Sequence, residues 1–319
     1  MRKLHIIAMI LLAITVLAVG CAQRDVGEER GIFGGDKGTV ETRAFIGGTN
    51  GLLLEFSPDR PRDKVFSGGA DPFDVEIQLI NDGEWEVMKD DVTVTLSGLD
   101  PAEFGYTEAR KNPDEDLLAK YRDPQGTVIP SNAVYIIYES LNREQPVLGD
   151  TTYPVRADIC YKYGTKAISS LCIRKDLRSR EEGVCAVDGS RVVQNSASPV
   201  QVVELTENAA SSTALAFTFR IQKKGNGKVY RLASDCNPQR VDENRVFVEI
   251  DTGLPGLVCS GLREGSDNTG YADLRAGEAI IRCKQDIAVQ NDFVKSINIK
   301  LQYDYKETIS TSIAVLPEE

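Results

Sequence analysis

The sequence predicts an all-β protein built from two tandem antiparallel β-sandwiches, and three observations predict it. Apolar residues alternate with polar ones in three runs, 73–80, 92–97 and 297–305, which is typical of half-buried antiparallel strands. Helical periodicity is confined to residues 114–121, where we expect one or two helical turns inside a long loop. The strand pattern also occurs twice along the chain, as described below.

An export signal is predicted at the N-terminus. Arg2 and Lys3 supply a positive start, and an apolar run of residues 6–19 follows, interrupted only by Thr15. The run fits the apolar core of a secretory signal, whereas a membrane span needs about 20 residues. We therefore expect the bulk of the chain outside the cytoplasm.

The apolar run ends in the sequence Leu-Ala-Val-Gly-Cys at residues 17–21. This ending resembles the lipobox of secreted lipoproteins, although Ala18 stands where that family usually has leucine. The resemblance implies a signal peptide over residues 1–20, lipidation of Cys21, and membrane attachment through the lipid. An uncleaved N-terminal anchor and ordinary cleavage near Cys21 remain as alternatives. Residues 21–43 carry glycines among charged side chains and are expected to form a flexible tether.

The internal repeat defines two copies of one strand pattern. Residues 73–79 align with 215–221 at an offset of 142 positions. At the same offset, Gly83 falls on Gly225, and Tyr161 and Tyr163 fall on Tyr303 and Tyr305. Residues 92–96 match 246–250 at an offset of 154, which places an insertion of 12 residues in the second copy around 231–243. The matched tyrosines are expected to be structural.

Strands of this length and spacing fit Ig-like sandwiches, with a barrel as the alternative. We expect sandwiches at 44–176 and 198–319, joined by a linker at 177–197. The apolar alternation followed by Asn-Asp-Gly at 81–83 resembles CARDB-type and related Ig-like modules of archaeal and bacterial surface proteins. The resemblance covers the second and third strands of each copy best. The second copy has Gly-Asn-Gly at 225–227 instead.

Six of the seven cysteines lie beyond Cys21, an even number that favours disulfides in an exported protein. If residues 161 and 171 lie on the two strands of one hairpin, Cys160 and Cys172 lie opposite each other. Cys259 and Cys283 lie within the second copy. The remaining two lie in the linker and in the insertion. The expected pairs are therefore Cys160–Cys172, Cys185–Cys236 and Cys259–Cys283. A thiolate metal site is the alternative, but no C-x-x-C spacing supports it.

Composition narrows the classes of function. The formal net charge is −11, and the single histidine, His5, lies in the segment expected to be removed. A mature chain without histidine excludes a Ser-His-Asp triad, a Cys-His dyad and histidine metal ligands. The acidic balance disfavours nucleic acid as a partner. We expect no enzymatic activity, no catalytic residue and no cofactor, and a hydrolase with paired carboxylates remains the alternative.

The acidic clusters and the single tryptophan are candidate binding sites. The acidic residues of 82–86, 89–91, 114–116 and 267–273 do not match a calcium-binding loop, and we expect them to be solvated without bound metal. Trp85 is expected in the core or in packing between strands, whereas its exposure beside other aromatic residues would favour a sugar-binding site.

The resulting hypothesis is a lipid-anchored extracytoplasmic protein that acts in binding, adhesion or scaffolding at the cell surface. Its expected partners are the membrane and a protein or glycan at the surface. Alternatives are a lipoprotein that binds carbohydrate or another small ligand, and a subunit of a surface filament.

Overall fold

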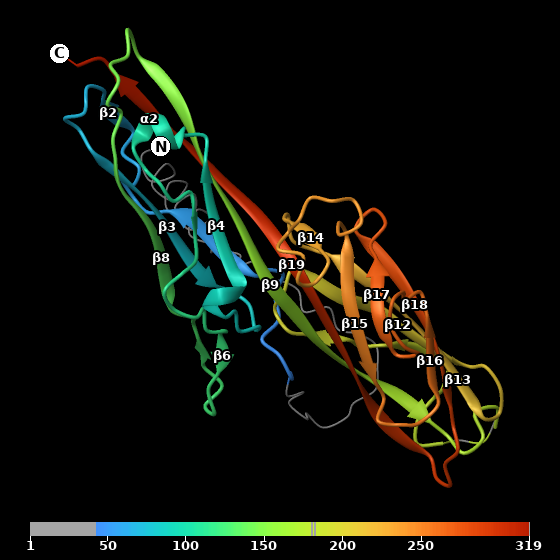
Figure 1. The fold of residues 1–319 in the computed structure, drawn as a ribbon. Helices are drawn as coiled ribbons and strands as arrows, with labels where there is room; N and C mark the ends of the chain where they lie inside the picture. Colours follow the sequence, from blue (N-terminus) through green and yellow to red (C-terminus); the bar gives the residue numbers. More distant parts are fainter. Residues whose placement is uncertain (1–42, 180, 182, 319) are drawn as a thin grey trace, which may run out of the picture. The chain divides into compact units, whose positions relative to one another are not determined.

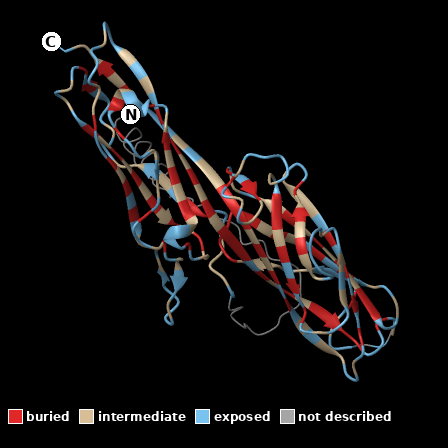
Figure 2. Cartoon of the chain, viewed as in Figure 1, coloured by how far each residue is buried: buried red, intermediate tan, exposed pale blue. Residues whose placement is uncertain are grey.

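Two long strands organise the structure, a computed structural model that describes residues 43–318 apart from 180 and 182. β9 (Thr151–Ile173) and β19 (Phe293–Leu316) run antiparallel and pair without interruption from Phe293↔Ile173 to Val315↔Thr151 (Figure 1). Most odd-numbered residues of both strands are buried, and most even-numbered ones are partly or fully exposed (Figure 2). We call the face that carries the even-numbered residues the outer face. The predicted all-β fold is confirmed.

The central sheet forms around these strands, in the order β17-β15-β19-β9-β4-β5. Its outer members are β17 (Thr269–Asp273), β15 (Arg245–Asp251), β4 (Val92–Ser97) and β5 (Arg110–Lys111). The short strands β14 (Lys228–Tyr230) and β2 (Lys64–Phe66) pair with β19, and β11 (Gln194–Asn195) pairs with β9. Each copy supplies three of these strands. The order β17-β15-β19 of the second copy is the reverse of the order β9-β4-β5 of the first copy, and the two long strands β19 and β9 meet in the middle.

Two smaller sheets cover the inner face of the central sheet. The first contains β1 (Leu52–Phe56), β3 (Phe73–Asn81) and β8 (Ala133–Leu141) in that order. The second has the order β10-β12-β13-β18-β16, with bounds Gly189–Arg191, Val200–Ala209, Ala214–Lys223, Glu278–Asp286 and Leu257–Ser260. Because the buried residues of β9 and β19 keep the same parity along both strands, both small sheets pack against the same face. We call the resulting layers the first and second sandwich.

An approximate two-fold axis relates the two copies. The ladder pairs Lys162 with Asp304, Tyr161 with Tyr305 and Tyr163 with Tyr303. Lys162 and Asp304 are also equivalent at the offset of 142, so the axis passes between them, perpendicular to the central sheet. The start of β9 lies in the first sandwich and its end in the second, and β19 runs the opposite way. Each copy therefore gives half of its last strand to the other sandwich.

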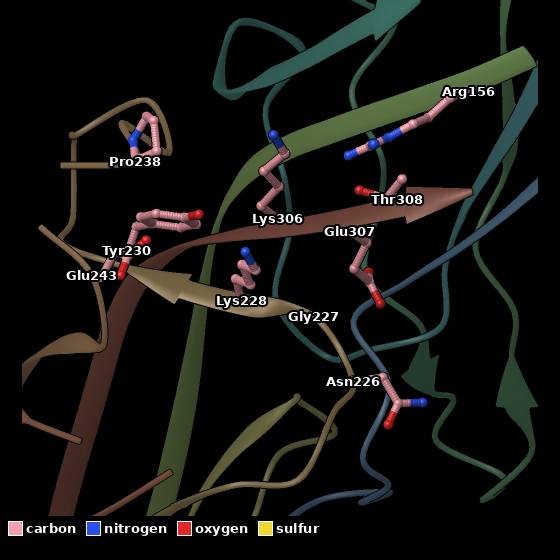
Figure 3. Close-up of a pocket in the computed structure, with 10 residues that line it drawn as sticks. All are labelled: Arg156, Asn226, Gly227, Lys228, Tyr230, Pro238, Glu243, Lys306, Glu307 and Thr308. Carbon is pink, nitrogen blue, oxygen red and sulfur yellow. The ribbon is translucent and has the colours of Figure 1, made fainter. Parts of the chain in front are cut away.

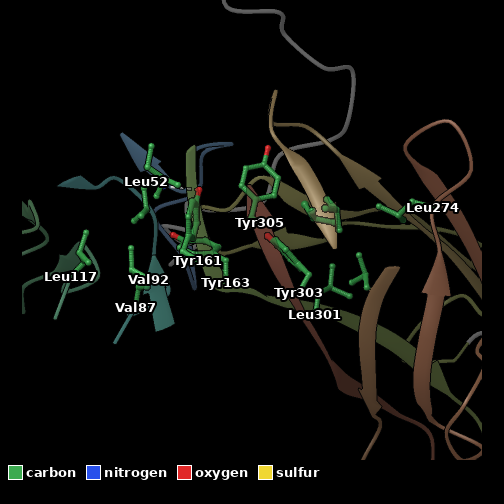
Figure 4. Packing of buried hydrophobic residues seen from close by; sticks show 14 of the residues in the cluster. Leu52, Val87, Val92, Leu117, Tyr161, Tyr163, Leu274, Leu301, Tyr303 and Tyr305 are labelled. Atoms are coloured by element: carbon green, nitrogen blue, oxygen red, sulfur yellow. Dashed lines mark hydrogen bonds between the residues drawn. The ribbon is translucent and has the colours of Figure 1, made fainter. Parts of the chain in front are cut away.

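The four matched tyrosines form the centre of the core, as predicted. Tyr161, Tyr163, Tyr303 and Tyr305 are each at most 1% exposed, and their rings lie side by side where the sandwiches meet (Figure 4). The rings of Tyr161 and Tyr305 meet edge to face with centroids 5.7 Å apart. Apolar residues of all sheets continue this core in both directions. The repeated tyrosines thus join the two sandwiches.

Two expectations about local structure are wrong. Residues 114–121 are extended and not helical, because Val87 and Leu117 exchange backbone hydrogen bonds and the Asp116 carboxylate accepts from the Lys89 amide. The helices in the described part are the 3-10 turn η1 (Lys89–Asp91) and α2 (Pro101–Phe104), which the Asp100 side chain caps. The region 161–171 is one strand and not a hairpin.

The expected linker 177–197 contributes strands to two sheets. It contains β10, which pairs with β12 of the second small sheet, and β11, which pairs with β9 of the central sheet. The expected boundaries at 176 and 198 do not mark breaks in the packing, because β9 and β19 cross from one sandwich to the other. The remaining elements are the strands β6 (Tyr121–Arg122) and β7 (Val128–Ile129), which form a small hairpin.

Candidate functional site

The disulfides are Cys160–Cys236, Cys172–Cys185 and Cys259–Cys283. The structure therefore contains the expected pair between β16 and β18. The expected pairs Cys160–Cys172 and Cys185–Cys236 are wrong. Cys160 and Cys172 lie on the single strand β9, twelve residues or about 40 Å apart, whereas a disulfide spans Cα atoms that are less than about 7 Å apart.

Two segments that cover the outer face explain why Cys160 and Cys172 have partners other than those expected. The chain leaving β9 folds back over the end of that strand, which brings Cys185 to Cys172. The insertion of the second copy lies over the centre of the central sheet, which brings Cys236 to Cys160, with Cα atoms 6.0 Å apart. The insertion is thus attached to the first copy's strand and not to the linker.

Asp304 anchors the same insertion beside the two-fold axis. Its carboxylate accepts hydrogen bonds from the backbone amides of Ala233 at 3.0 Å and Ser234 at 2.7 Å. Asp304 is 1% exposed, and this burial raises its pKa although the backbone donors oppose the shift. Its counterpart Lys162 forms an ion pair with Asp91, and the hydrogen bond to Asp91 raises the pKa of Lys162.

A hollow of about 370 Å³ lies at the edge of this insertion (Figure 3). We call it the central hollow. It is lined by Arg156 of β9, by residues 226–228 and Tyr230 around β14, by Pro238 and Glu243 of the insertion, and by residues 306–308 of β19. Lys228 and Lys306 are direct neighbours in the β14–β19 ladder, an arrangement of like charges that is unfavourable without a neighbouring anion.

Asp158 supplies that anion. Its carboxylate accepts a hydrogen bond from Thr308 Oγ1 at 2.6 Å, and it forms ion pairs with Lys306 at 3.3 Å and Arg156 at 3.2 Å. Burial opposes the shift, but the Thr308 hydrogen bond and the two cations together lower the pKa of Asp158. The central hollow is therefore a balanced polar surface, in which Lys228 is the one lining cation without an ion pair among the described residues.

Glu307 marks a difference between the copies at this site. The Tyr161 hydroxyl donates to Glu307 Oε2 at 2.7 Å and accepts from the Leu52 amide at 3.3 Å. Burial raises the pKa of Glu307, while the Tyr161 hydrogen bond opposes that shift. The equivalent of Glu307 in the first copy is Thr165, which lies beside the Tyr303 hydroxyl. The Thr165 hydroxyl is engaged elsewhere, and the Tyr303 hydroxyl has no hydrogen-bond partner in the described part of the chain.

Trp85 is not fully buried, but it packs against the hydrophobic core. It is partly exposed and packs on the outer face against Gly164, where a Cβ atom would lie 2.5 Å from its ring. Lys166 Nζ and Lys300 Nζ lie 5.8 Å and 5.9 Å from the ring centroid. The equivalent position in the second copy is Gly227, in the wall of the central hollow.

The acidic clusters serve local structure. Glu84 accepts from three backbone amides, Asp82 pairs with Lys120, and Asp116 accepts from the Lys89 amide. Among residues 43–318 apart from 180 and 182, no group of three acidic, cysteine or histidine residues is arranged to hold a metal ion. No helix in the described part is long and apolar enough to cross a membrane. Cys21 and the tether at 21–42 lie outside the described residues.

Sequence reasoning missed the residues of the central hollow. The insertion at 231–243 was the one sequence feature that could have pointed to them, because extra residues in one copy must pack on the surface that the two copies share. The partners of Asp158 could not be found in this way, because they come from two strands whose pairing the repeat does not specify.

Comparisons with known proteins do not assign the chain to a family. No family model matches it, and no curated protein matches it significantly. Among solved structures, the envelope protein VP37 from White Spot Syndrome Virus is similar over 45% of this chain and 97% of that one. The sequence identity is 11% and the TM-score is 0.23, a level of likeness that carries no argument about fold or function.

Proposed function

We propose that this chain is a lipid-anchored extracytoplasmic protein that acts by binding or scaffolding at the cell surface, and not as an enzyme. The observation that carries the proposal is the disulfide set. All six cysteines beyond Cys21 are paired with one another, and such bonds persist in oxidising compartments outside the cytoplasm. We assign to Cys21 the lipid that its resemblance to a lipobox implies.

The fold supports a role in presenting surfaces. The β9–β19 ladder joins both sandwiches, and the disulfide Cys160–Cys236 fixes the insertion to it. Loops and sheet edges held on such a scaffold are common binding surfaces. In this proposal the lipid holds the chain at the membrane, residues 21–43 act as a spacer, and the Ig-like sandwiches contact a protein or glycan.

The test is the intact mass of the protein extracted from its native membrane, with and without reduction before thiol alkylation. We expect a chain that starts at Cys21, carries acyl chains, and gains six alkyl groups only after reduction. A Cys21→Ser variant is the matched control, since it should lose the acyl mass and keep the three disulfides. An unlipidated chain whose thiols react without reduction would overturn the proposal.

A further inference from the structure

A second hollow lies beside Trp85, and we call it the Trp85 hollow. Its volume is about 390 Å³. Its walls are formed by Phe45, by Lys166 and Ile168 of β9, by Glu249 and Asp251 of β15, and by Asn298 and Lys300 of β19. Lys166 and Lys300 line the hollow and also lie over the Trp85 ring, so the ring adjoins it. Aromatic, apolar, cationic and amide groups thus meet on one patch of the outer face.

The Phe45 wall is held in place by hydrogen bonds. The amides of Ile46 and Gly47 each donate to the Glu84 carboxylate at 2.9 Å, and the Ala197 amide donates to it at 2.7 Å. The Ala44 amide donates to Gln194 Oε1 at 2.7 Å. The segment on either side of Phe45 is therefore tied to the sandwich, so the hollow does not depend on a ligand to form.

The charges of the hollow leave one cation available. Lys300 lies 3.9 Å from Glu249, and Asp251 accepts a hydrogen bond from the Gly253 amide at 2.7 Å. Lys166 Nζ has no hydrogen-bond or ion-pair partner among the described residues, and its contact is with the Trp85 ring. Glu249 and Asp251 also line the hollow, but Glu249 is paired with Lys300, so Lys166 is the lining cation that can contact a negative group of a ligand.

We propose that the Trp85 hollow binds an acidic sugar of a glycan, with its carboxylate at Lys166. The C–H face of a sugar ring packs against aromatic side chains, which Phe45 in the wall and Trp85 beside the hollow supply. Sugar hydroxyls need acceptors and donors, which the Asp251 carboxylate and the Asn298 amide supply. A simple anion would use only the lysine, and an apolar ligand would leave the polar wall unpaired. The inference rests on the proposed binding function and names the class of ligand.

Trp85 is the only tryptophan of the chain, so its fluorescence reports this hollow alone. The full-length protein in detergent is titrated with a galacturonic acid trisaccharide and with the neutral galactose trisaccharide. We expect a saturable change in Trp85 fluorescence with the acidic sugar and at least tenfold weaker binding of the neutral one. Calorimetry on the same samples measures the affinity independently of the fluorophore.

Lys166→Ala should weaken acidic-sugar binding about tenfold, because a charged hydrogen bond is lost. Lys166→Arg should restore most of it. The matched control is Lys228→Ala, which removes the lysine without an ion pair from the central hollow and should leave the affinity unchanged. Phe45→Ala should weaken the binding in high salt as well as in low salt.

Three results would overturn the assignment. One is that neither the Trp85 fluorescence nor the calorimetry shows saturable binding of the acidic sugar. Another is equal weakening by Lys166→Ala and Lys228→Ala, which would indicate attraction to charge in general. The third is equal or tighter binding of a triglutamate peptide, which would indicate an acidic peptide as the ligand. The mass of the same preparation shows whether the lipid and the disulfides are present, so a failure here can be told apart from a failure of the proposed function.

Discussion

The two sandwiches share the central tyrosines and the order of three matched strands in their small sheets, β1-β3-β8 and β12-β13-β18, but they differ on the outer face. Gly83 packs under the Tyr163 hydroxyl and Gly225 under the Tyr305 hydroxyl, so this contact is the same in both copies. On the outer face, Trp85 stands where the second copy has Gly227, and an insertion covers only one side of the two-fold axis. The repeated residues are therefore those that join the copies, and the residues that diverge line the two hollows.

The largest expected effect comes from the disulfides that tie the copies or close a loop. Cys160–Cys236 links the copies across 76 positions, whereas Cys172–Cys185 closes a loop across 13 positions. In the chain-entropy model the first contributes about 4.5 kcal/mol and the second about 3 kcal/mol. The free energies of unfolding of two variants, Cys160→Ser with Cys236→Ser and Cys172→Ser with Cys185→Ser, measure these two contributions in denaturant titrations. Equal losses would show that the link between the copies adds nothing beyond local closure.

The shared glycines allow a matched pair of substitutions. A Cβ on Gly83 would lie 1.6 Å from the Tyr163 hydroxyl, and one on Gly225 would lie 2.4 Å from the Tyr305 hydroxyl. Both alanine variants should therefore lose stability by overpacking, about 1–3 kcal/mol for Gly225→Ala and more for Gly83→Ala. Thermal unfolding gives the order. A neutral Gly83→Ala would mean that Tyr163 can move without cost.

The equivalent tyrosines Tyr161 and Tyr303 should respond differently to loss of the hydroxyl. Tyr161→Phe removes the donor of Glu307 and an acceptor of the Leu52 amide, which should cost about 1–3 kcal/mol. Tyr303→Phe removes a buried hydroxyl without a partner in the described structure and should be neutral or stabilising. The free energies of unfolding of the two variants check this difference. A costly Tyr303→Phe would reveal a bond that replaces the missing one, such as an ordered water.

The smallest effect is a pH dependence at Glu307. Burial raises the pKa of its carboxyl above the ordinary value of 4.5, so the folded state binds the proton more tightly than the unfolded state. Its contribution is full below pH 4.5 and is lost as the pH rises through the folded pKa. Glu307→Gln should therefore be slightly more stable than the parent at pH 7, with a difference that shrinks as the pH falls toward 4.5. A difference that grows on acidification would contradict this.

Much of the fold could be predicted because the period-two alternation of a strand records which side chains are buried. The alternation of residues 73–79 and 297–305 identified half-buried strands, and the offset of 142 equated residues that turned out to be related by symmetry. The alternation does not record which strand lies alongside. The crossing of β9 between the sandwiches, and with it two of the disulfides, therefore had to come from the structure.

The hollows were less accessible to sequence reasoning than the core. Trp85 stands out in the sequence as the single tryptophan, but aromatic residues beside strands are most often buried. This one packs on the outer face, because Gly164 leaves room for its ring. Lys166 and Lys300 lie on different strands, and only the β9–β19 register brings them to one ring. A composite site of this kind depends on pairing between residues more than 130 positions apart.

The exchange of final strands has a consequence for how the chain acquires its structure during synthesis. The core of the first sandwich includes Ile313 and Val315 of β19, which are synthesised after every other strand of both sandwiches. The first copy therefore cannot close its core in the order in which it is made, and it must wait, partly assembled, for the end of β19. Folding is then a single late event that depends on distant contacts, which are slow to form. In such a protein, removal of the last residues of β19 would damage the first sandwich, although those residues follow the whole of the first copy in the chain.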